Sequence, residues 1–263
     1  MKIATGKQAY SATRTRIKAQ GISFTEPELD AALKQRLPPL LADEEGRSRI
    51  RQSLVGIQNT QFESARLQAA LNSMVELQNW QVGEAMAEAY LIDHRDCEFP
   101  WPSSRDLRNP SASPAGADLV GFHGSGSAVR FAFGEVKTSE EKKWPPQVVT
   151  GRHGLVNQLE DLRDSVEIKN HLALIYLGHR AQGAAWHPTW KSASTRYLRN
   201  PGDVSLFGVL VRDVQPKEED VKPRMDRLAN GCPSDTSIEL LAFYLPDGSI
   251  KSLGNRAAKD RSK

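Results

Sequence analysis

The feature that most restricts the fold is a pair of apolar segments joined by Gly-Ser-Gly-Ser. Residues 117–123 read ADLVGFH and residues 128–138 read AVRFAFGEVKT, with GSGS between them at 124–127. Aromatic and branched apolar residues favour strands in both segments, and the glycines favour a turn between them. The sequence therefore predicts a β-hairpin over residues 117–138.

The segments around this hairpin predict a mixed sheet with helices packed against it. Residues 80–96 have a helical pattern, and GLVNQLEDLRDSV at 154–166 places leucines at helical steps. VSLFGVLVRD at 204–213 and SIELLAFYL at 237–245 predict two more strands, and a Pro-Asp-Gly turn follows the second. HLALIYLGH at 171–179 fits either a helix or a strand, and residues 100–116 predict a loop. This order of elements indicates the α/β class.

The sequence predicts separate roles for the two ends of the chain. Residues 1–80 are predicted to be a helical N-terminal segment for partner or dimer contacts, because apolar residues recur at mostly helical spacing over 48–77. Residues 81–253 form the main domain, and residues 254–263, GNRAAKDRSK, are predicted to be a basic flexible tail.

Composition narrows the classes of function only slightly. The net charge of +3 permits a nucleic-acid partner without requiring one. The two cysteines, Cys97 and Cys232, lie far apart, which argues against a disulfide scaffold and against a CxxC zinc site. No apolar run is long enough to span a bilayer, and the first residues lack the apolar centre of a secretory signal. We therefore expect a cytoplasmic protein with no membrane partner.

The second hairpin strand ends in two opposite charges on one face. Glu135 and Lys137 are two positions apart, so they share a face of the strand while Val136 points to the other. An exposed pair of this kind contributes less than about 1 kcal/mol and needs no function. Asp118, however, opens the first strand, and a hairpin of this length would bring it beside Glu135. Two adjacent carboxylates imply a shifted pKa or a bound cation, and oxygen ligands suit Mg²⁺ or Mn²⁺.

With the neighbouring helices included, these residues resemble a known family. Glu84 and Glu88 lie one turn apart in the first helix, GAD contains Asp118, GEVK contains Glu135 and Lys137, and VNQLEDL contains Gln158. The series is similar to that of the PD-(D/E)XK nuclease superfamily, and it covers roughly residues 80–180. It departs at residue 117, an alanine where the family name has proline, although that proline is often absent in the superfamily.

The resemblance implies a restriction-endonuclease-like fold and a metal-dependent nuclease. It implies that Asp118, Glu135 and the main-chain carbonyl of Val136 bind Mg²⁺ or Mn²⁺, and that Lys137 orients or helps to deprotonate the attacking water. One helix glutamate, Glu84 or Glu88, would be an outer ligand. Glu84 is favoured because the adjacent Gly83 permits a close approach of the backbone. Gln158 would contact the water or the phosphate.

Further expectations concern the partners. The resemblance favours DNA over RNA, and Lys142, Lys143 and Arg152 are the expected phosphate contacts. The pattern is also similar to nuclease subunits of bacterial anti-phage defence systems, including the Hachiman type, which works with a helicase. A homodimer is a further option. Two alternatives stay open: a catalytically inactive nucleic-acid-binding module of the same fold, and an unrelated enzyme or toxin in which Glu135 and Lys137 form a surface ion pair.

Overall fold

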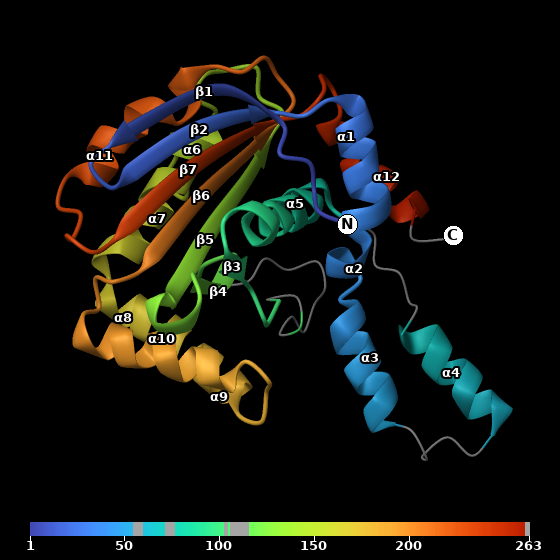
Figure 1. Ribbon diagram of the computed structural model, residues 1–263. Helices are drawn as coiled ribbons and strands as arrows, with labels where there is room; N and C mark the ends of the chain where they lie inside the picture. The colour runs from blue at the N-terminus through green and yellow to red at the C-terminus, as the bar shows by residue number, and fades with distance from the viewer. Residues whose placement is uncertain (55–59, 72–76, 103–104, 106–115, 261–263) are drawn as a thin grey trace.

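A computed structural model describes residues 1–54, 60–71, 77–102, 105 and 116–260. In these residues, seven strands form one mixed sheet in the order β1-β2-β7-β6-β5-β4-β3 (Figure 1). The three central strands are parallel: β5 (Arg130–Ser139), β6 (Ser205–Arg212) and β7 (Ser237–Tyr244). The α/β class and the mixed sheet predicted from the sequence are confirmed.

The strands outside this centre add one further parallel strand, β2, and antiparallel strands at both edges. On one side, β4 (Leu119–His123) pairs antiparallel with β5, and β3 (Cys97–Glu98) pairs antiparallel with β4. The predicted hairpin is therefore present, and its connection contains the short helix η3 (Gly126–Ala128). On the other side, β2 (Ile17–Ser23) runs parallel to β7 and antiparallel to β1 (Lys7–Arg14), which forms that edge of the sheet.

Helices cover both faces of the sheet, so apolar residues point to both sides of its central strands (Figure 1). One face packs against α5 (Asn79–His94), α1 (Glu26–Ala31), the π-helix η1 (Ala32–Arg36), η7 (Ile250–Ser252) and α12 (Leu253–Asp260). The other packs against α6 (Gln147–Thr150), α7 (Leu155–Asp164), α8 (Val166–Asn170), η4 (His171–Tyr176), α9 (Leu177–Ala181), α10 (His187–Arg199) and α11 (Met225–Ala229). The short helices η5 (Glu218–Asp220) and η6 (Lys222–Arg224) precede α11.

Three helices of the N-terminal part follow η1, of which the first packs against α5 and the other two lead away from the sheet. They are α2 (Pro38–Leu41), α3 (Glu44–Ser53) and α4 (Gln61–Leu71), and Figure 1 shows α3 and α4 projecting from the body. The helical pattern expected over 48–77 is thus present in α3 and α4, while residues 55–59 and 72–76 lie outside the described part. Large apolar side chains on this projection are exposed, including Ile50 (48%) and Phe62 (65%).

The structure corrects the expectation of a helical segment over residues 1–80. Residues 7–14 and 17–23 are strands, because β2 adds to the edge of β7 and buries Ile17 and Ile22 there. The flexible tail expected over 254–263 is also wrong for residues 254–260. They continue α12, which packs Leu253 and Ala257 into the core beside α5.

Two ambiguous regions also become clear. Residues 171–181 are helical and form η4 and α9. Their apolar side chains pack against the face of the sheet that α7 and α10 also cover. Most of the loop expected over 100–116 lies outside the described residues. Among the described ranges, no helix is long and apolar enough to cross a membrane.

Candidate metal centre

The register of the β4–β5 hairpin brings the first two carboxylates together. Leu119 pairs with Gly134, so Asp118, one residue before β4 begins, lies opposite Glu135. Oδ2 of Asp118 accepts a hydrogen bond from the main-chain N–H of Val136 at 2.8 Å. The N–H and C=O of one strand residue point to the same side. The carbonyl of Val136 therefore faces the edge that β4 leaves open.

Glu135 and Lys137 differ from an ordinary surface pair in their burial. Nζ of Lys137 donates to Oε1 of Glu135 at 2.6 Å, and the side chains are 1% exposed for Glu135 and 23% for Lys137. In the described part of the chain, Oε2 of Glu135 is buried and receives no hydrogen bond. The carboxyl groups of Glu135 and Asp118 lie within hydrogen-bonding reach of each other, and two buried carboxylates so close are costly unless a proton or a cation lies between them, so this oxygen is a candidate ligand position.

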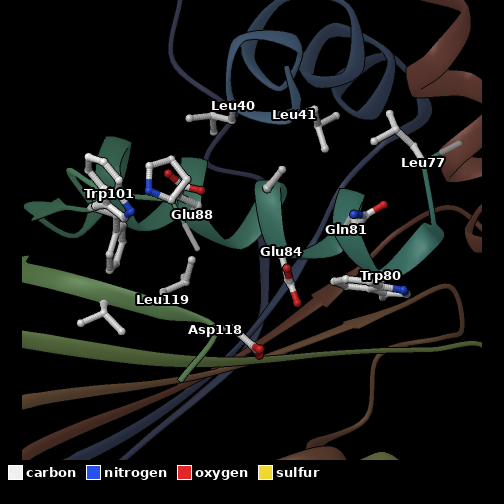
Figure 2. A pocket seen from close by; sticks show the side chains of 14 residues that line it. Leu40, Leu41, Leu77, Trp80, Gln81, Glu84, Glu88, Trp101, Asp118 and Leu119 are labelled. Atoms are coloured by element: carbon white, nitrogen blue, oxygen red, sulfur yellow. The ribbon is translucent and has the colours of Figure 1, made fainter. Parts of the chain in front are cut away.

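Glu84, on α5, lies near the carboxyl groups of Asp118 and Glu135. Gly83 lets the helix lie against β5, since a Cβ built on Gly83 would be 2.1 Å from Oγ1 of Thr138. Figure 2 shows the Glu84 side chain pointing toward Asp118 across the space between the helix and the sheet. The sequence favours Glu84 because Gly83 permits a close approach of the backbone. The packing of Gly83 against β5 agrees with this reason.

The pKa values of these carboxyl groups show how much negative charge is gathered here. Burial, together with repulsion from Asp118 and Glu135, raises the pKa of Glu84 to about 9. Burial and the charge of Asp118 raise the pKa of Glu135 to about 8, against the opposing effect of Lys137. Burial also raises the pKa of Asp118, although the N–H of Val136 and the charge of Lys137 act in the opposite direction. The three groups form one acidic cluster beside one lysine.

Glu88 lines the same pocket as Glu84, but different charges act on its carboxyl group. Burial raises its pKa to about 7, and the charges that act on it are those of Arg36, Asp43 and Arg105. Asp118 and Glu135 are not among them. The structure therefore places Glu84, rather than Glu88, with the carboxylates of the hairpin.

The other predicted residues lie around this centre. Gln158 is on α7, whose leucines pack on the face of β5 that carries Phe131 and Phe133. By strand alternation, Glu135 and Lys137 point to that same side. Oε1 of Gln158 is buried, and in the described part of the chain it has no hydrogen-bond partner. Lys142, Lys143 and Arg152 are exposed in the segment that follows the end of β5.

The donor atoms of this centre fit a hard divalent cation. Two carboxylates and a main-chain carbonyl are oxygen ligands, which Mg²⁺ and Mn²⁺ prefer, and Mg²⁺ usually keeps several waters as well. In the described ranges, no three His, Cys, Asp or Glu side chains gather into a metal-ligating group. A cation here would therefore depend on Asp118, Glu135, the carbonyl of Val136 and water, with Glu84 further out.

A pocket opens beside Glu84 and Asp118 between α5, α2 and the start of β4. It has a volume of about 90 Å³. Its wall is mainly apolar, as Figure 2 shows, and is formed by Leu40, Leu41, Leu77, Trp80, Gln81, Glu84, Ala85, Glu88, Phe99, Trp101, Pro102, Asp118, Leu119 and Val120. Trp80 is not among the residues that the sequence pattern predicts for the site, although its position four residues before Glu84 on a helix is a signal for it.

Comparison with known proteins adds no assignment. No family model matches the chain, and no curated protein matches its sequence. Support for a function therefore comes from the sequence resemblance and from the geometry of the site.

Proposed function

We propose that this protein is a Mg²⁺-dependent nuclease that hydrolyses phosphodiester bonds, with the restriction-endonuclease-like site that the sequence resemblance implies. The observation that carries the proposal is the buried carboxylate of Glu135. One of its oxygens binds Lys137 and the other has no partner in the described residues, at the open strand edge where Asp118 also lies. A surface ion pair would have both groups in water.

Each residue has a distinct role in this proposal. Asp118, Glu135 and the carbonyl of Val136 would hold the cation. When bound, Mg²⁺ lowers the pKa of a water ligand and offsets the charge of the phosphate. Lys137, which is partly exposed, orients the attacking water and stabilises negative charge near it. Glu84 accepts hydrogen bonds from water around the cation, and Gln158 contacts the water or the phosphate.

DNA is the proposed substrate, with RNA as the alternative. Lys142, Lys143 and Arg152 are exposed beyond the end of β5, where they can contact phosphates on either side of the cut. Action in the cytoplasm agrees with the two free cysteines, Cys97 and Cys232. A role in anti-phage defence with a helicase, and a homodimer, are the partner proposals that follow from the resemblance.

The test is a cleavage assay on supercoiled, linear double-stranded and single-stranded DNA with Mg²⁺, Mn²⁺ or EDTA. We expect metal-dependent cleavage by the wild type and a loss of at least about 100-fold in Glu135→Gln and in Lys137→Ala. Glu218→Gln is the matched control, since Glu218 forms an exposed ion pair with Lys222. Equal cleavage by all variants would contradict the site. Metal-dependent DNA binding without cleavage would identify an inactive binding module instead.

A further inference from the structure

Trp80 occupies an unusual position for a tryptophan. It lies four residues before Glu84 in α5, so the two side chains share one face of the helix. Both line the pocket that also contains Asp118, and Figure 2 shows the indole of Trp80 along its wall. The ring is only half-buried. Part of an aromatic ring thus borders the pocket that contains Glu84 and Asp118, one of the carboxylates that would hold the cation.

The rings of the other four tryptophans each contact a positively charged side chain or another aromatic ring. Trp101 lies under the guanidinium groups of Arg105 and Arg180, at 4.9 Å and 5.6 Å. The remaining contacts are Trp144 with Lys217, Trp186 with Phe122, and Trp190 with His187. Within the described part of the chain, Trp80 packs on no aromatic ring and under no cation. Trp80 is of intermediate exposure, so part of its ring can contact a ligand at the pocket.

We propose that Trp80 is the stacking platform for an unpaired nucleobase next to the phosphodiester that is cut. This inference rests on the proposed nuclease function and specifies its substrate class as single-stranded DNA, or a duplex end that frays. In an intact duplex both faces of a base are covered by its neighbours, so only a base that leaves the stack can reach an indole. Proteins that bind single strands use aromatic side chains in this way.

The walls of the pocket favour a base over another phosphate. Leu41 and Leu77 line it with apolar surface, while Glu84 and Glu88 offer no positive charge to an additional phosphate. A volume of about 90 Å³ holds several water molecules, which a flat uncharged ring would displace. Asp118 and Trp80 line the same pocket, so a base stacked on the indole would place its own phosphate near the carboxylates.

The first test measures binding without cleavage. In the Glu135→Gln background, fluorescence anisotropy would give the Kd of a single-stranded 20-mer and of a hairpin duplex. We expect Trp80→Ala to weaken single-strand binding by about 5- to 150-fold and duplex binding much less, and Trp80→Phe to retain most of the affinity. Phe62→Ala is the control, because this aromatic residue is 65% exposed on α4, away from the sheet (Figure 1).

The second test locates the base. The wild type would be assayed in Mg²⁺ on single strands with one abasic site moved stepwise past the cut. At one position, we expect the abasic site to raise the KM of the wild type as much as the Trp80→Ala substitution does. At that position, the abasic site should not raise the KM of Trp80→Ala any further. Single-strand binding by Trp80→Ala that equals that of Phe62→Ala would overturn the inference. If the wild type cuts no DNA but Trp80→Ala still weakens single-strand binding, the nuclease function fails while the base site stands.

Discussion

At the scale of single residues, burial decides what the Glu-x-Lys pattern means. The same residues on a solvated strand would form a weak ion pair. Here the carboxylate of Glu135 is 1% exposed and has a neighbouring carboxylate, Asp118, as well as a lysine. The protein keeps this arrangement although it disfavours the ionised form of Glu135. That cost is offset when a cation neutralises the cluster.

This electrostatic cost predicts an unusual dependence of stability on pH. The folded pKa of Glu135 is raised from 4.5 to about 8, so the folded protein binds more protons than the unfolded chain between these values. The contribution of Glu135 to stability is therefore complete below pH 4.5 and is lost as the pH rises through 8. The free energy of unfolding should fall by up to about 1.4 kcal/mol per pH unit for one such proton.

Thermal unfolding in EDTA between pH 5 and pH 9 checks this prediction. Glu135→Gln should gain stability relative to the wild type as the pH rises, and Mg²⁺ should remove most of the difference by stabilising the wild type. A difference between the two proteins that does not change with pH would contradict the coupling. Glu218→Gln, at an exposed ion pair, should follow the wild type throughout.

At the scale of secondary structure, the site depends on how closely α5 approaches β5. Gly83 faces Thr138, and a Cβ at residue 83 would come within 2.1 Å of Oγ1 of Thr138. Such a contact requires the Thr138 side chain, the helix or the strand to shift, and a shift of the helix also moves Glu84, the next residue in α5. Although alanine is the better helix former by about 1 kcal/mol, the steric cost is expected to dominate.

We therefore expect Gly83→Ala to lower the free energy of unfolding by about 1–3 kcal/mol and nuclease activity by about 10-fold or more. Adding Thr138→Ala removes the hydroxyl group, after which the next contacts of the new Cβ, 3.7 Å to Cγ2 of Val211 among them, are ordinary. The double variant should recover most of both losses. Urea unfolding and single-strand cleavage measure the two effects, and failure of Thr138→Ala to restore either one would show that the Gly83 contact does not position α5.

The same elements show how far sequence reasoning reached. The hairpin, α5, α7, β6 and β7 were predicted because each carries a local apolar pattern, and the Asp118–Glu135 pairing followed from the hairpin register. The strand β1 carries no such pattern, because most of its side chains are exposed. Its partner β2 is positioned by pairing with β7, a strand more than 200 residues later in the sequence. The choice of Glu84 over Glu88, and the role of Trp80, depend on how α5 lies on the sheet. Local sequence does not determine that orientation.

At the scale of the whole molecule, the N-terminal strands belong to the sheet that carries the site. Tyr10 on β1 shares a hydrogen bond of 3.0 Å with Tyr244 on β7, joining the edge of the sheet to its centre. Ile22 and Phe24 enter the core that also contains Val136 of β5. The first residues thus help to hold together the layers between which α5 and β5 meet.

This continuity predicts that a fragment of residues 81–263 will not fold as the full chain does. Removing residues 1–80 exposes the edge of β7 and the apolar surface that Ile17, Ile22 and Phe24 cover. Each such side chain contributes about 1.5–3 kcal/mol when buried, against a total stability of about 5–15 kcal/mol for a typical protein. The fragment should lose its cooperative thermal transition and its near-ultraviolet circular dichroism. Removing only residues 1 and 2, which are exposed, should preserve both. A fragment that unfolds cooperatively and cleaves DNA would instead show that residues 1–80 form a separate module.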